Sequence, residues 1–116
     1  MAPISITELQ PPLFPANNRP AFTQSVRRLL PQLWAIVLSK ALQSGIKAAG
    51  AIDAETDRDS GALTAILRVY LDANAAQALA FWNGLDSDLE GWMARLNTAN
   101  RLVAQRDVSL RVHWFR

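Results

Sequence analysis

The sequence predicts an α+β domain with two layers, in which amphipathic helices pack on one side of a small sheet of two or three strands. Apolar residues recur at three- and four-residue steps over residues 21–49, which is the spacing of a helix with one buried face. Apolar and polar residues alternate over 62–71 and again over 108–116, which is the spacing of half-buried strands. Half of the 116 residues are hydrophobic, so the chain can bury one core without disulfides or a structural metal.

Residues 1–20 are predicted to form a proline-rich arm in front of a single domain over residues 21–116. Within the arm, residues 3–9 suit a short strand because they contain Ile4 and Ile6. Four prolines follow between positions 11 and 20, and proline excludes a regular helix or a central strand because it fixes φ and has no amide donor. The composition leaves open whether the arm packs on its own domain or reaches a partner chain.

The first helix is predicted from residue 21 to about residue 49, where Gly45 or Gly50 ends it. Pro31 is expected to kink or divide this helix, because proline removes one helical hydrogen bond. Residues 51–62 are polar and acidic and close with a serine and a glycine, which predicts a loop.

Alternating carboxylates in this predicted loop raise the question of a calcium site, since calcium takes carboxylate oxygens from such loops. When Asp53 is the first ligand, Arg58 stands where glycine is needed and Thr64 stands where glutamate is needed. We therefore predict a solvated loop that binds no metal. Its acidic residues are Asp53, Glu55, Asp57 and Asp59.

The second half of the chain is predicted to alternate strand and helix. Residues 62–71 form a strand, after which Asp72 or Asn74 caps a helix that stops at Asn83-Gly84. A second helix then starts at once.

This next helix is predicted from a capping box formed by Ser87 and Glu90, and Asn97 or Asn100 is a candidate interruption of it. Residues 108–116 form the last strand, so the predicted order is (β)-α-β-α-α-β, with the first strand in the arm. A right-handed crossover that makes the two long strands parallel fits this spacing, and an antiparallel arrangement stays open.

Two strands alone make a marginal sheet, so residues 3–9 or the same strand of another subunit is expected to extend it. Trp114 at the end of the last strand needs cover from the domain's own helices or from a second chain, and Trp82 is expected to be partly exposed. The less apolar face of the sheet is the candidate binding surface. Its residues are Arg68, Tyr70, Arg111, His113 and Phe115.

The sequence supports three hypotheses of function, of which the first two rest on this surface. Arginine and aromatic residues are enriched at protein interfaces, so the leading hypothesis is a non-enzymatic binding or assembly module that self-associates through its sheet or its N-terminal arm. The alternative is a single-stranded nucleic-acid-binding domain whose sheet face contacts phosphates and bases. A small enzyme with a carboxylate site around Asp72 and Asp88 is the second alternative. The expected partner is a second copy or another protein, with nucleic acid as the alternative.

The composition argues against several chemistries. The chain has no cysteine, which excludes disulfides, thiolate metal sites and cysteine nucleophiles. His113 is the single histidine, so a multi-histidine zinc site cannot form, and no phosphate-binding glycine loop occurs. We therefore expect no metal and no cofactor. The net charge of +2 does not by itself indicate a polyanionic partner.

The N-terminus lacks the positive start and the apolar core of a signal peptide. The longest apolar run, residues 33–38, is too short to cross a bilayer. These features predict a cytoplasmic protein without a membrane anchor.

Overall fold

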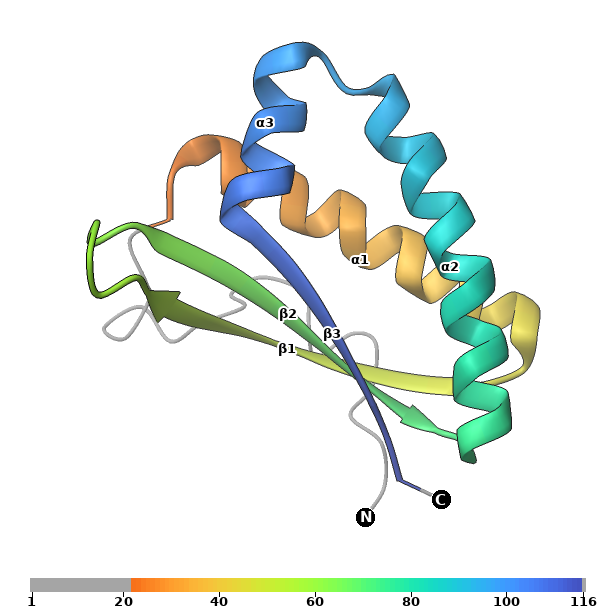
Figure 1. The fold of residues 1–116 in the computed structure, drawn as a ribbon. Helices are drawn as coiled ribbons and strands as arrows, with labels where there is room; N and C mark the ends of the chain where they lie inside the picture. Colours follow the sequence, from red (N-terminus) through yellow and green to blue (C-terminus); the bar gives the residue numbers. More distant parts are fainter. Residues whose placement is uncertain (1–21, 116) are drawn as a thin grey trace.

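The structure is a computed structural model that describes residues 22–115. In this part of the chain, three helices cover one face of a three-stranded sheet (Figure 1). The predicted two-layer α+β class is confirmed. The predicted arm and its short strand lie outside the described residues. The elements in chain order are α1 (Gln24–Ser44), β1 (Lys47–Thr56), β2 (Leu63–Asp72), α2 (Ala75–Arg95), α3 (Thr98–Asp107) and β3 (Val108–Trp114).

The sheet has the strand order β1-β2-β3. β1 is antiparallel to β2 and reaches it through a short turn, whereas the chain passes through α2 and α3 before β3 pairs with β2 in parallel. The predicted parallel crossover is therefore confirmed. The register places Leu67 of β2 between Ile52 and Leu110, so among the described strands β2 is central and β3 lies at an edge.

β1 was not predicted, because residues up to 49 were expected in the helix and residues 51–62 in a loop. The helix α1 ends at Gly45, whose φ of 66° is a left-handed conformation that glycine adopts without strain. The alanine-rich segment that follows has weak strand propensity, but it pairs with β2 along its whole length. The observed order is α-β-β-α-α-β, and the third strand comes from residues 47–56.

Pro31 does not divide α1, which is one helix from its cap at Thr23 to Gly45. A proline inside a helix costs about 3 kcal/mol. Leu30 and Leu33, on either side of Pro31, are both buried, and each contributes about 1.5 to 3 kcal/mol. Burial of this helix face therefore offsets the cost of the proline.

α2 is also continuous, so the predicted stop at Asn83-Gly84 and the predicted start at Ser87 are wrong. The capping box lies at Asn74 instead, whose side chain accepts from the Gln77 amide at 2.8 Å while the Gln77 side chain accepts from the Asn74 amide at 3.0 Å. Gly84 allows the close approach of the Lys40 side chain, 3.4 Å from where a Cβ would stand. The predicted interruption at Asn97 is confirmed, since Asn97 caps α3.

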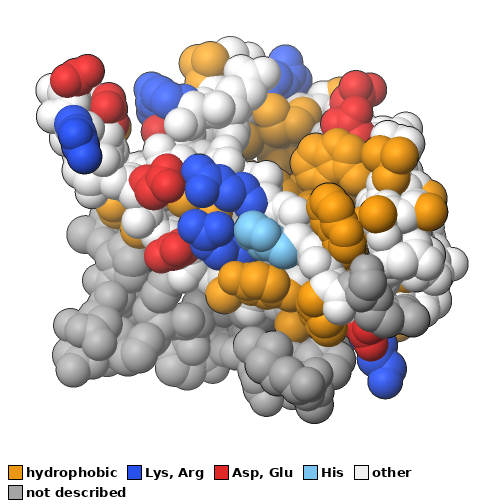
Figure 2. All heavy atoms as spheres, turned by 60° about the horizontal axis from the view of Figure 1, so that its bottom comes forward, with side chains coloured by type: hydrophobic (Ala, Val, Ile, Leu, Met, Phe, Trp, Pro, Cys, Tyr) orange, Lys and Arg blue, Asp and Glu red, His pale blue; other side chains and the backbone are white. Residues whose placement is uncertain are grey.

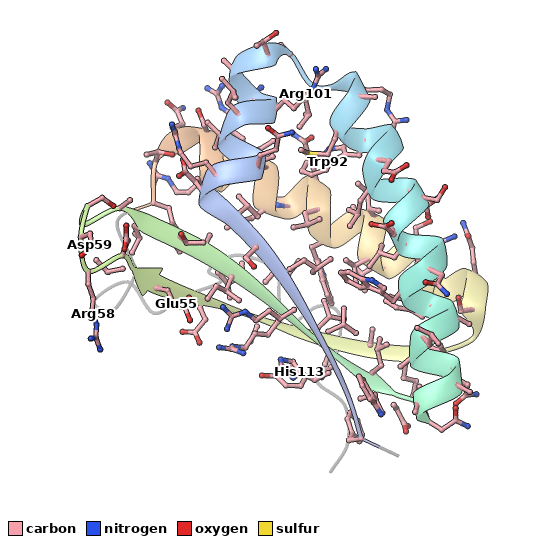
Figure 3. All side chains as sticks on the ribbon, viewed as in Figure 1. Glu55, Arg58, Asp59, Trp92, Arg101 and His113 are labelled. Carbon is pink, nitrogen blue, oxygen red and sulfur yellow. The ribbon has the colours of Figure 1, made fainter. Side chains whose placement is uncertain are left out.

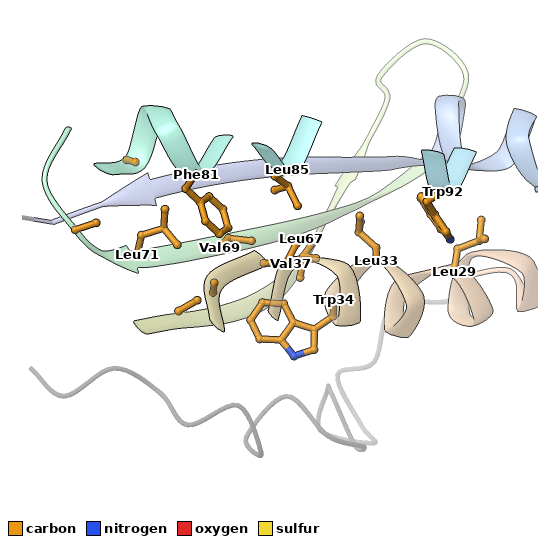
Figure 4. Close-up of a cluster of buried hydrophobic side chains, with 14 of the residues drawn as sticks. Leu29, Leu33, Trp34, Val37, Leu67, Val69, Leu71, Phe81, Leu85 and Trp92 are labelled. Atoms are coloured by element: carbon orange, nitrogen blue, oxygen red, sulfur yellow. The ribbon is translucent and has the colours of Figure 1, made fainter. Parts of the chain in front are cut away.

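Two clusters of buried apolar side chains fill the space between the helices and the sheet. The larger one joins α1 and α2 to the sheet through residues that include Val37, Leu67, Phe81 and Leu85 (Figure 4). The smaller one lies at the start of α1. It consists of Phe22, Val26, Leu30 and Ala65. Alternate residues of the central strand β2 belong to these clusters and form its inward row, the one that contacts the helices: Ala65, Leu67, Val69 and Leu71.

Trp34 and Trp92 are buried in the core. The Trp92 indole N–H donates to Oε1 of Gln32 at 3.0 Å, which links α2 to α1. This bond adds a polar contact to the apolar packing between the two helices.

Candidate functional site

The sheet face opposite the helices brings together four of the five predicted binding residues. The parallel register sets Arg68 beside Arg111 and Tyr70 beside His113. The Tyr70 and His113 rings are stacked, with centroids 5.1 Å apart and an angle of 19° between planes. Nη1 of Arg68 lies 3.5 Å from Nε2 of His113. We call these four residues the outer cluster.

Two carboxylates from β1 neutralise the arginines of the outer cluster. Nε of Arg68 lies 3.2 Å from Oδ2 of Asp53, and Nη2 of Arg111 lies 3.3 Å from Oε2 of Glu55. Figure 3 shows Glu55 on the same side of the sheet as His113, and Figure 2 shows acidic and basic side chains interleaved beside the histidine. The face is therefore balanced in charge. Exposed pairs of this kind contribute about 0 to 1 kcal/mol each.

These carboxylates were not predicted to be part of the site, because both were assigned to a loop. The sequence did carry a signal for them. Ile52 and Ala54 alternate with Asp53 and Glu55, which is the period of a strand with one polar face. Only Asp57 and Asp59 lie in the turn between β1 and β2.

The turn is organised by Asp57, which accepts the Ser60 hydroxyl at 2.7 Å and the Asp59 amide at 3.4 Å. The Ser60 hydroxyl and the Asp59 amide together hold the pKa of Asp57 below its ordinary value. Within residues 22–115, no group of three or more histidine, aspartate or glutamate side chains is arranged to hold a metal ion.

Phe115, the fifth predicted residue, follows directly after β3 and continues its pairing. Its amide donates to the carbonyl of Leu71 at 3.3 Å, and its ring is exposed. The backbone keeps Phe115 at the end of the sheet, close to the end of the described chain (Figure 1).

The outer edge of β3 is the second feature that can bind a partner, because no described strand pairs with it. The Phe115 amide points toward β2, and amides of successive residues in a strand point in opposite directions. The N–H and C=O groups of Leu110, Val112 and Trp114 therefore point away from β2. These three residues also carry their side chains on the helix side of the sheet, in register with the inward row of β2.

An apolar groove of about 290 Å³ lies beside this edge, between the start of α2 and the end of β3. Its largest exposed side chains are Leu79 at 61%, Trp82 at 37% and Trp114 at 51% exposure. Figure 2 shows hydrophobic side chains gathered on the α2 side of the histidine. The groove residues are Ala75, Ala78, Leu79, Trp82, Val112 and Trp114. We call this set the edge groove.

The stretch of α2 that contributes to the edge groove has no charge. Residues 75–85 read AAQALAFWNGL and contain no lysine, arginine, aspartate or glutamate. A helix on the surface of a monomer ordinarily places charged residues on its solvent face. The uncharged stretch is visible in the sequence, but it indicates a binding groove only once β3 is known to lie beside α2. The expected partial exposure of Trp82 is confirmed.

The two carboxylates named for an enzyme site do not form a pair. Asp72 ends β2 just before α2, whereas Asp88 lies 13 residues beyond Ala75 in α2, about 20 Å along the helix. Asp88 instead pairs with Lys40 at 3.0 Å.

Each helix between residues 22 and 115 falls short of the length or the apolar character needed to span a lipid bilayer. In comparisons with protein-family models, with curated proteins and with solved structures, nothing matches the chain.

Proposed function

We propose that this chain is a non-enzymatic protein-binding module that uses the outer edge of β3 together with the edge groove. The observation that carries the proposal is the meeting of an unpaired strand edge with an uncharged groove in the described residues. A strand edge offers main-chain hydrogen bonds to an extended partner, and an adjacent groove accepts alternate side chains of that partner. We expect the module to act in the cytoplasm.

Two tryptophans that line the groove support this proposal. Trp82 and Trp114 come from different elements and line the same groove, each partly exposed. Tryptophan is the residue most enriched among those that dominate binding energy at protein interfaces. Apolar patches of this kind on soluble proteins mark interaction sites.

The outer cluster supports the alternative, a single-stranded nucleic-acid-binding domain, through one observation. The stacked rings of Tyr70 and His113 are bordered by two guanidinium groups, an arrangement that suits an unpaired base. Both arginines, however, already pair with Asp53 and Glu55. We therefore rank this function second. Binding to a single-stranded oligonucleotide that weakens steeply with added salt would favour it.

The proposed function is tested by panning a library of random 12-residue peptides against the full chain. We expect the bound peptides to alternate apolar and polar residues, since one face of an extended strand would enter the groove. Leu79→Glu should abolish their binding. Leu42→Glu is the matched control, because Leu42 is 74% exposed on α1 and is not part of the groove. Equal binding by both variants would contradict the proposal.

A further inference from the structure

We infer that the partner at the β3 edge is a second copy of this chain, with the two β3 strands antiparallel about a two-fold axis at Val112. The inference rests on the proposed function and names its partner. Two three-stranded sheets would then join into one continuous sheet.

The absence of charge in the edge groove favours a second copy. A two-fold interface places one patch against itself, so the patch must be complementary to itself. A charged patch would repel its own copy, whereas residues 75–85 and the helix-facing side chains of β3 carry no charge in the described chain. The centres of protein interfaces are likewise depleted of charge and enriched in tryptophan. The groove also offers no charge with which to select a charged foreign partner.

The exposed area also favours a second copy. The exposed parts of Trp82 and Trp114 amount to roughly 200 Å² per chain, taking about 250 Å² for a tryptophan. A stable interface covers about 800 Å² on each partner. An isolated extended peptide covers only the strand edge and the groove of this chain, whereas a folded second copy would also cover the α2 surface beside them. Leu79 and the exposed alanines of α2 would contribute to the remaining area.

The register follows from which amides point outward. Val112 has its N–H and C=O on the edge with which no described strand pairs, so it can form a hydrogen-bonded pair with the partner's Val112. This register sets Leu110 against the partner's Trp114 on the helix side and Arg111 against the partner's His113 on the other side. The edge grooves, which include Val112 and Trp114, then lie next to each other across the axis.

Two other two-fold registers are less favourable. An axis at Arg111 places two guanidinium groups opposite each other, with Cα atoms about 4.5 Å apart, where like charges are destabilising. An axis at Leu110 sets Trp114 against position 106 of the partner, which belongs to α3 and not to a strand. The axis at Val112 pairs strand with strand and separates the arginines.

The absence of cysteine makes single-cysteine crosslinking a direct test of this register. With the axis at Val112, the Cα atoms of two Val112→Cys chains would be about 5.5 Å apart, within the range of a disulfide. Ser109→Cys is the matched control on the same strand. Its two copies would be about 20 Å apart, because each Ser109 faces position 115 of the partner.

We expect light scattering to give twice the chain mass of 12.8 kDa at micromolar concentration, and mild oxidation to crosslink Val112→Cys but not Ser109→Cys. Leu79→Glu should halve the mass, whereas Leu42→Glu should leave the dimer intact. A full chain that stays monomeric at 100 times that concentration, or crosslinking of Ser109→Cys alone, would refute the inference. A chain that stays monomeric but binds library peptides whose binding Leu79→Glu abolishes would refute the dimer and would still support the proposed binding module. We call these peptides groove-dependent.

Discussion

Leu85→Ala tests whether α2 runs unbroken through Asn83-Gly84 onto the sheet. Leu85 is 0% exposed and belongs to the main cluster with Phe81 and Leu67. Burial of a leucine side chain contributes about 1.5 to 3 kcal/mol, and the cavity left by truncation brings the total cost to about 2 to 5 kcal/mol. We expect a loss of about 3 kcal/mol in the free energy of unfolding. For a chain of this size, such a loss lowers Tm by roughly 12 °C.

The assay is urea unfolding followed by tryptophan fluorescence, at one fixed protein concentration because association adds to apparent stability. With a urea dependence of about 2 kcal/mol per molar, the midpoint should fall by roughly 1.5 M. Leu42→Ala is the matched control and should change stability by less than about 0.5 kcal/mol, since Leu42 is exposed on α1. If Leu85→Ala lowers the free energy of unfolding no more than Leu42→Ala does, Leu85 does not lie in the core and the described packing of α2 is refuted.

Three smaller perturbations test local features. Asn74→Ala should cost about 1 kcal/mol in urea unfolding because it removes the cap of α2, and an unchanged midpoint would argue against the capping box. Ser60→Ala should raise the pKa of Asp57 toward its ordinary value in an NMR titration. Because the pKa of Asp57 is lower in the folded chain than in the unfolded chain, the ionised Asp57 side chain stabilises the fold at pH values above its unfolded pKa, and this stabilisation is lost as the pH falls through its folded pKa. Glu55→Gln should cost at most about 1 kcal/mol, since its pair with Arg111 is exposed, and a larger cost would show a more tightly held outer cluster.

The sequence predicted the strands with period two most accurately. Residues 62–71 and 108–116 were expected in strands, and the structure has strands at Leu63–Asp72 and Val108–Trp114. On the central strand β2 the apolar row of Ala65, Leu67, Val69 and Leu71 is buried, so burial and local pattern agree there. The alternation also predicted Arg68 and Arg111 on one face of the sheet if the two strands are neighbours, and the observed register sets the two side by side.

The errors occurred where local signals and tertiary packing disagree. Asn83-Gly84 is a strong local stop signal, but the buried positions Phe81 and Leu85 on either side of it share one helix face. β1 is rich in alanine and acidic residues, which favour helix or loop in isolation, and it becomes a strand because β2 offers ten paired positions.

The edge groove could not be predicted from the sequence, because it is formed by elements distant in the chain. Trp82 and Trp114 are 32 positions apart, and only the parallel crossover brings the start of α2 beside the end of β3. The outer cluster was predicted without its carboxylates for a different reason: Asp53 and Glu55 were assigned to a loop, and they reach the cluster because that segment is the strand β1.

Amide hydrogen exchange along β3 tests the use of its edge most directly. The amides of Ser109, Arg111 and His113 face β2 and should be protected at every protein concentration. The amides of Leu110 and Val112 face outward, so their protection should rise as concentration increases and the edge becomes paired. If Leu110 and Val112 exchange rapidly at all concentrations, and also when the groove-dependent peptides are bound, the edge of β3 is not the binding element.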